Sequence, residues 1–218
     1  MAEQIVLNLA VIFGVILVSM TLHEAMHGFV AYWLGDDTAK LQGRLTLNPI
    51  KHIDPFLSIL LPLILAVTGA PIFGGARPVP FNPNRVRYDE WGAALVALAG
   101  PLTNFAIAFI VFGISVLLHF NPSSLSYSNP LEMALTYGAV VNLGFFVFNM
   151  LPIPPLDGSR VLYALAPDFV RRGMEVMEQY GLVLVFILVL LGGSLIGPVI
   201  GGAIEGILQF FAKLFIVS

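Results

Sequence analysis

Long apolar stretches separated by short polar connectors dominate the 218-residue chain. Apolar positions run almost without a break through 4–34, 91–120 and 131–151, and each stretch is long enough for a helix that crosses a bilayer. The tail 181–218 is also apolar, and because glycines interrupt it, we expect two further passes there. The pattern predicts an all-α polytopic membrane protein with about five transmembrane helices.

Composition supports a protein that lies in the lipid bilayer. Hydrophobic residues make up 58% of the chain and charged residues 11%, with a mean hydropathy of +0.91. The net charge is −3 and no basic cluster is present, so we expect no nucleic acid partner. We expect a single membrane-embedded domain over 1–218, with a catalytic core over about 5–166 and C-terminal passes over 181–218.

A motif typical of zinc hydrolases, His23-Glu24-Ala25-Met26-His27, lies in the first apolar stretch. Residues four apart share a face of a helix, so the two imidazoles can bind one metal ion. Glu24 lies on an adjoining face, where it can take a proton from a metal-bound water. Ionisable groups deep in an apolar helix are costly and indicate function. The alternative is a pair of core histidines with Glu24 as their counter-ion.

A catalytic zinc site needs a third protein ligand. The chain has no cysteine, so that ligand must be His, Asp or Glu. The candidates in or beside apolar stretches are His52, Asp54, His119, Glu132, Asp157 and Glu205. Asp157 is favoured because it follows proline-broken backbone at membrane depth, which is tolerated where it lines a cavity or is buried in protein. The alternative is that Asp157 caps a helix starting near Ser159.

Three motifs together resemble a known family. The His23–His27 motif is followed by Gly100-Pro101-Leu102-Thr103-Asn104 and then by Asn149-Met150-Leu151-Pro152-Ile153-Pro154-Pro155-Leu156-Asp157-Gly158. Their order and spacing, over about 10–165, resemble the site-2 protease family of intramembrane zinc metalloproteases, peptidase family M50. We expect a compact form without PDZ or CBS domains.

The resemblance implies a catalytic apparatus with one Zn²⁺ per chain. It implies that His23, His27 and Asp157 bind the metal and that Glu24 is the general base. By the same resemblance, Asn149 helps to hold the substrate backbone or the developing oxyanion.

The two ligand sets constrain the topology. Each lies near the carboxyl end of its segment, so 4–34 and 131–151 should run parallel, with an odd number of crossings between them. One of 56–73 and 91–120 therefore does not cross, and the proline-interrupted 56–73 is predicted to be re-entrant. All ten Lys and Arg residues then fall on one face, which the positive-inside rule assigns to the cytoplasm. We expect an external amino terminus and an active site towards the cytoplasmic side of a prokaryotic cell membrane.

The predicted function is hydrolysis of a peptide bond within or next to the transmembrane segment of a single-pass membrane protein, in regulated intramembrane proteolysis. A prenyl-protein peptidase would share only the first motif. A non-catalytic zinc-binding membrane scaffold or a metal transporter is the alternative from another class. Glu24 disfavours the scaffold, and a transporter would carry ligands along several spans. The oligomeric state is not predicted.

Further residues have more than one interpretation. Asn104, a polar residue in an apolar stretch, either pairs between helices or points at the site, where it could contact substrate or the oxyanion. His52 lies in a loop beside Asp54, where it either has an accessory role or orients the loop. The proline-rich stretch 77–83 could form a short extended edge or hairpin near the active site, to which an unwound substrate adds as a strand.

Overall fold

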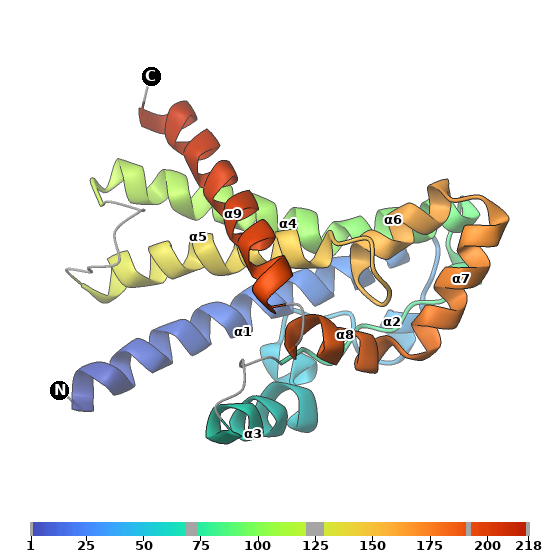
Figure 1. The fold of residues 1–218 in the computed structure, drawn as a ribbon, viewed down its shortest axis with the longest axis horizontal. Coiled ribbons are helices and arrows are strands. Elements are labelled where there is room, and N and C mark those ends of the chain that lie inside the picture. Colours follow the sequence, from blue (N-terminus) through green and yellow to red (C-terminus); the bar gives the residue numbers. More distant parts are fainter. Residues whose placement is uncertain (1, 69–73, 121–128, 191–192, 217–218) are drawn as a thin grey trace.

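The computed structural model describes residues 2–68, 74–120, 129–190 and 193–216 (Figure 1). Within these residues the regular structure is helical and contains no strand. The long helices are α1 (Ala2–Trp33), α4 (Asp89–Leu117), α5 (Pro130–Asn149) and α9 (Gly193–Ile216). The short ones are α2 (Thr38–Leu41), η1 (Pro49–His52), η2 (Pro55–Leu60), α3 (Leu61–Thr68), η3 (Pro83–Arg85), α6 (Asp157–Leu165), α7 (Asp168–Gln179) and α8 (Gly181–Leu190).

The described helices include four that are long and apolar enough to cross a membrane: Val6–Trp33, Asp89–Leu117, Pro130–Asn149 and Ile196–Phe215. A fifth is present if α7 and α8 are counted as one span, although they meet at 83°. This confirms the prediction of an all-α polytopic membrane protein. The two passes expected in the tail are unequal, because the 10 residues of α8 extend about 15 Å, half the thickness of the hydrocarbon core.

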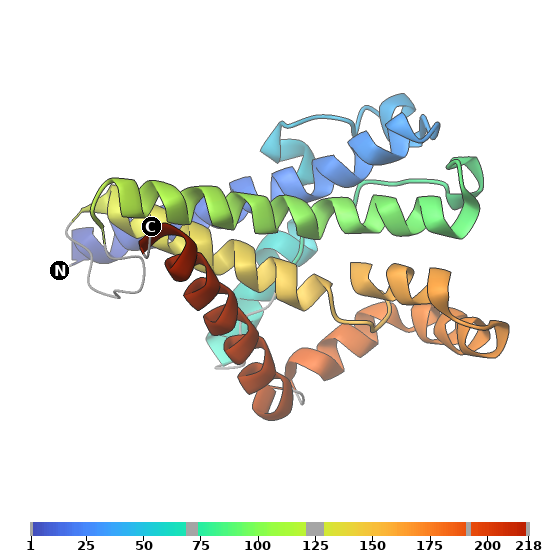
Figure 2. The ribbon, with the colours of Figure 1, turned by 90° about the horizontal axis from the view of Figure 1, so that it is seen from above.

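The bundle that holds the site consists of α1, α4 and α5. Figures 1 and 2 show that α1 and α5 run in the same direction and that α4 runs against them. The parallel course predicted for the two ligand-bearing segments is therefore confirmed. Small buried residues, such as Ala25 in α1 and Ala97 and Ala108 in α4, let the helices approach closely. Close packing of this kind drives helix association in lipid, where the hydrophobic effect between helices is weak.

The C-terminal helix α9 is attached to this bundle through aromatic rings. Phe211 is fully buried, and its ring centroid lies 5.5 Å, 5.2 Å and 5.6 Å from those of Phe105, Phe109 and Phe112 in α4. Edge-to-face contacts of this kind add about 0.5–1.5 kcal/mol each to packing. They join the last span to α4, whereas α7 and α8 lie apart from the bundle in the view of Figure 2.

The chain is hydrogen-bonded to itself across the two ends of the apolar stretch 56–73. The hydroxyl of Ser58 donates to the Gly75 carbonyl at 2.6 Å, and the Gly75 amide donates to the Leu57 carbonyl at 3.1 Å. Residues 69–73 of the stretch lie outside the described residues. Because its two ends are hydrogen-bonded to each other, they lie at the same depth, as the prediction of a re-entrant segment requires.

Single cysteines placed on either side of this stretch test its re-entry, because the natural chain has none. Gln42→Cys and Asn84→Cys are both exposed positions. We expect a membrane-impermeant maleimide to label both cysteines from the same side of the membrane, in a comparison of intact cells with inverted vesicles. Labelling from opposite sides would mean that 56–73 crosses the bilayer.

Candidate metal centre

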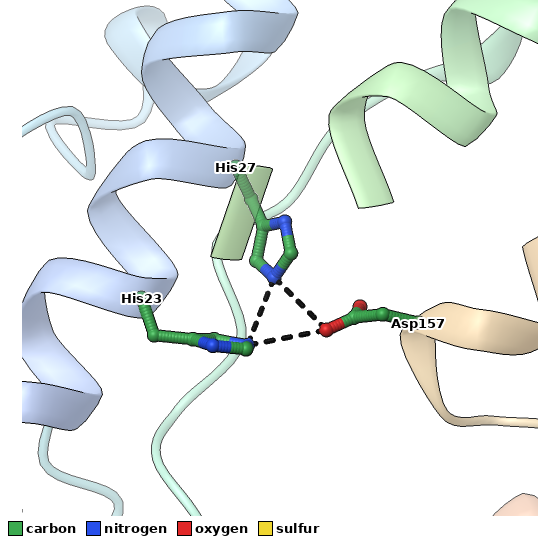
Figure 3. A group of neighbouring side chains, drawn as sticks. All are labelled: His23, His27 and Asp157. Carbon is green, nitrogen blue, oxygen red and sulfur yellow. Dashed lines mark hydrogen bonds and ion pairs between the residues drawn. The ribbon is translucent and has the colours of Figure 1, made fainter. Parts of the chain in front are cut away.

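Three side chains from opposite halves of the sequence converge between α1 and the start of α6 (Figure 3). His23 Nε2 lies 3.1 Å from His27 Nε2 and 3.2 Å from Asp157 Oδ2, and His27 Nε2 lies 3.5 Å from the same oxygen. Both histidines are buried, and Asp157 is half-buried. Among the described residues this is the one group of three or more His, Asp or Glu side chains close enough to share a metal ion.

The outer nitrogens of both imidazoles face hydrogen-bond acceptors. His23 Nδ1 lies 2.6 Å from Asn104 Oδ1, and His27 Nδ1 lies 2.7 Å from the Val96 carbonyl oxygen. Each Nδ1 is therefore placed to donate its hydrogen outward, and in the neutral form of each ring the lone pair of Nε2 faces inward. Asp157 Oδ2 is itself buried without a hydrogen-bond partner among the described residues. Three lone pairs can thus point at one another, an arrangement that a bound cation would stabilise.

The spacing of these atoms fits zinc. Ligand bonds of about 2.0–2.1 Å in tetrahedral geometry place neighbouring ligand atoms about 3.3–3.4 Å apart. The three separations in the structure, 3.1, 3.2 and 3.5 Å, lie around that value. Two imidazoles and one carboxylate are a ligand set typical of catalytic zinc, which keeps its fourth position for water or substrate.

Asp157 reaches the histidines because the chain turns tightly after α5. It is the first residue of α6, and the residue at the cap position is Leu156, with no side-chain cap. The capping role considered for Asp157 is therefore not observed. A Cβ on the next residue, Gly158, would lie 2.3 Å from the Met150 carbonyl oxygen. Only glycine allows α6 to begin this close to the end of α5, and this contact sets the position of the carboxylate.

The histidines lie against a strip of α4 that matches their spacing. Val96, Gly100 and Asn104 follow one another at intervals of four on α4, as His23 and His27 do on the antiparallel α1. A Cβ on Gly100 would lie 2.5 Å from His27 Nε2 and 2.7 Å from His23 Cε1. Because Gly100 has no side chain, both rings come close to the backbone of α4, and the residues on either side supply their hydrogen-bond acceptors.

Glu24 does not pair with the histidines. Its Oε2 accepts a hydrogen bond from the Val79 amide at 2.9 Å. Val79 belongs to the extended stretch 74–82, and its side chain is buried. The guanidinium of buried Arg44 donates to the carbonyls of Arg77 and Pro78, at 2.8 and 3.2 Å, and fixes this stretch. Glu24 is therefore oriented by a main-chain amide from the extended stretch, and it is not the counter-ion of a histidine pair.

The stretch 77–83 has no regular structure up to Pro83, where η3 begins, and most of its main-chain donors are already used. Its amides donate from Arg77 to the His52 carbonyl, from Val79 to Glu24 and from Asn82 to Asp36, and prolines 78, 80 and 83 have no amide hydrogen. A substrate strand would find few donors here, and no hairpin forms among the described residues. The structure therefore gives 77–83 a supporting role and does not favour the predicted addition of a substrate strand.

The far end of this stretch is held by a buried carboxylate. Asp36 Oδ2 accepts from the Asn82 amide at 2.6 Å, and Asp36 Oδ1 accepts from the amide and hydroxyl of Thr38. Burial acts to raise the pKa of Asp36, but the bonds from Thr38 and Asn82 outweigh it and hold the pKa below its ordinary value. A lowered carboxyl pKa means that Asp36 stabilises the folded chain above its ordinary pKa and loses this effect as the pH falls through the lowered one.

Three other predicted site residues lie outside the ligand group. Asn104 is fully buried behind His23, so its position favours orienting that ligand over contacting a substrate. Asn149 is the last residue of α5, and its amide nitrogen donates to the Phe145 carbonyl of the same helix at 3.0 Å. His52 is buried, and its Nε2 bonds to the Thr46 carbonyl at 2.8 Å, which favours the loop-orienting interpretation.

Comparisons with known proteins identify the family of the chain. The family model described as Peptidase family M50 matches residues 11–129 and 117–192. A Bacillus subtilis protein named "Putative zinc metalloprotease YwhC" is 41% identical over 204 residues, 92% of this chain and 90% of the relative. The Mycobacterium tuberculosis protein named "Putative zinc metalloprotease Rip2" is 31% identical over 207 residues, 93% of this chain and 73% of the relative. No solved structure matches.

The chain belongs to peptidase family M50. The resemblance to the site-2 protease family is thereby confirmed. Together with the apolar helices, this membership makes the protein an integral membrane metalloprotease of the zinc class. Sequence reasoning did not identify the Val79 amide or the buried polar residues Ser19 and Asn142. A polar residue within an apolar span was the available sign for Asn142, as it was for Asn104.

The close contact at Gly100 predicts the effect of adding a single methyl group. Gly100→Ala should displace both imidazoles and remove zinc from the purified protein, measured as metal per chain. Gly144→Ala is the matched control, because a Cβ at Gly144 in α5 meets nothing within 4 Å. If Gly100→Ala keeps its zinc while remaining folded, α4 does not position the histidines.

Proposed function

We propose that this M50 protein hydrolyses a peptide bond within or next to the transmembrane segment of a single-pass membrane protein, as a step of regulated intramembrane proteolysis. The observation that supports it is the convergence of His23, His27 and Asp157 in a bundle of membrane-spanning helices, with Glu24 next to one ligand. The three side chains would hold one zinc ion per chain.

Glu24 is the proposed general base. When bound, zinc supplies Lewis acidity that lowers the pKa of a coordinated water far below that of bulk water, towards about 7. Val79 holds Glu24 through Oε2, and no described residue donates a hydrogen bond to Oε1. Oε1 is therefore the atom that takes the proton of the attacking water and later passes it to the leaving amine. The amide bond fixes the direction of Oε1 without adding a charge.

Asn149 is the proposed donor to the substrate. Its amide nitrogen has two hydrogens, and one is donated to the Phe145 carbonyl. The other remains for the carbonyl oxygen of the scissile bond, whose developing negative charge it would stabilise. A half-buried position at the end of α5, eight residues before Asp157, is compatible with this role.

The proposed membrane orientation places the amino terminus outside and the site towards the cytoplasm of a prokaryotic cell. The short return of 56–73 supports it, because all ten Lys and Arg residues then lie on one side. Water would reach the site from that side.

Replacing the general base and replacing a metal ligand should have different effects on zinc binding and on cleavage. Glu24→Gln should keep zinc but lose cleavage of a labelled transmembrane peptide, because the amide cannot accept the proton. His23→Ala should lose both zinc and cleavage. Proteolysis by Glu24→Gln would refute the role of Glu24, and zinc binding without any cleavage by the natural chain would favour a scaffold or a transporter.

Removing the amide that orients Glu24 should lower cleavage without removing zinc. Val79→Pro lacks the donor to Oε2, so cleavage should fall by about tenfold or more, a part of the roughly 10²–10⁴-fold that general-base catalysis contributes, while zinc content is retained. Val79→Ala keeps the amide and serves as the control for the lost side-chain packing. Equal activity of the two variants would show that the Val79 amide does not support the base.

A further inference from the structure

A chain of polar residues is buried behind His23, between the three helices of the bundle. Ser19 of α1, Asn104 of α4 and Asn142 of α5 are 3%, 0% and 1% exposed. Asn104 Nδ2 donates to Asn142 Oδ1 at 2.8 Å. Asn142 Nδ2 donates to Ser19 Oγ at 2.8 Å and to the Gly138 carbonyl at 2.7 Å. Buried polar networks are costly unless satisfied, and here both amide groups have their partners.

The orientation of the Asn104 amide determines which tautomer His23 adopts. With Oδ1 towards the ring, Asn104 accepts the Nδ1 proton, and Nε2 keeps the lone pair that a metal ion needs. If the amide turned over, its NH₂ group would face Nδ1, which would then have to accept. The proton would move to Nε2 and block the position of the metal. Asparagine has nearly the same shape in both orientations, so shape alone does not select one.

The orientation of the Asn104 amide is selected at the other end of this series of hydrogen bonds, at Asn142. The Gly138 carbonyl can only accept a hydrogen bond, so it turns Asn142 Nδ2 towards itself. Asn142 Oδ1 then points at Asn104 and can only accept, which turns Asn104 Nδ2 away from His23. A main-chain carbonyl of α5 thereby sets the direction of the hydrogen bonds up to the imidazole. The Ser19 carbonyl, at 3.5 Å from Asn104 Nδ2, is a longer contact that favours the same orientation.

We propose that Asn142 is a positioning residue that keeps His23 in its metal-binding tautomer by locking the orientation of the Asn104 amide. The proposal rests on the zinc site of the proposed function, but it concerns metal binding and does not require that the protein cleaves a substrate.

The first test is zinc affinity of the full chain, purified in detergent and titrated against a chromophoric chelator. Asn142→Leu removes both hydrogen-bonding groups at similar size and should weaken zinc binding by about 10–100-fold, the range known for residues that orient metal ligands. Thr136→Val is the matched control. It alters a buried hydroxyl of the same helix that has no hydrogen-bond partner among the described residues, so zinc affinity should not change. Unchanged affinity in Asn142→Leu would overturn the proposal.

A second background separates orientation from packing. Asn104→Asp has no NH₂ group, so either carboxylate oxygen accepts from His23 Nδ1 and nothing remains for Asn142 to lock. In that background Asn142→Leu should change zinc affinity by less than about threefold, because its effect passes through the Asn104 amide and the two residues are coupled. An equal loss in both backgrounds would show a packing effect and overturn the proposal. A natural chain that binds zinc but cleaves nothing would contradict only the proteolytic function, whereas one that binds no zinc would contradict both.

Discussion

Three lone pairs held against one another in a mostly apolar bundle are the constraint on which the rest of this structure depends. Nε2 of His23, Nε2 of His27 and Oδ2 of Asp157 lie within 3.5 Å of each other, and none has a hydrogen to offer the others. Such an arrangement is repulsive without a cation and strongly attractive with one. The packing of α1 against α4, the tight turn after α5 and the direction of each buried hydrogen bond all keep these three atoms together.

Main-chain groups and two glycines position much of the site. The Val96 carbonyl orients His27, the Val79 amide orients Glu24, and Gly100 and Gly158 let neighbouring segments come close enough for the contacts to form. Few water molecules are available at membrane depth, so each polar group there needs a partner from the protein. Main-chain groups fill this need with little conformational freedom, which gives the site a fixed geometry before any metal or substrate arrives.

The features that could be predicted from sequence are those marked by a short-range spacing or by the small number of candidate residues. The interval of four between His23 and His27 is local, and Asp157 stood out because few ionisable residues lie near apolar stretches. The shared direction of α1 and α5 followed from the need for both ligand sets to meet. By contrast, the Val79 amide has no side chain to mark it, and the contact between Asn142 and Asn104 depends on the register in which α4 packs on α5. The 83° bend between α7 and α8 lies where a charged, amphipathic segment meets the apolar tail, a boundary that the sequence does mark.

X-ray absorption at the zinc edge of the purified natural chain is the most direct measurement of the central claim. Two imidazole nitrogens and one carboxylate oxygen from the chain should surround one zinc ion at about 2.0–2.1 Å, with a further light ligand in the fourth position. In Asp157→Ala the carboxylate contribution should disappear or the zinc should be lost. An absence of zinc in the natural chain, or a zinc environment that Asp157→Ala leaves unchanged, would contradict the account.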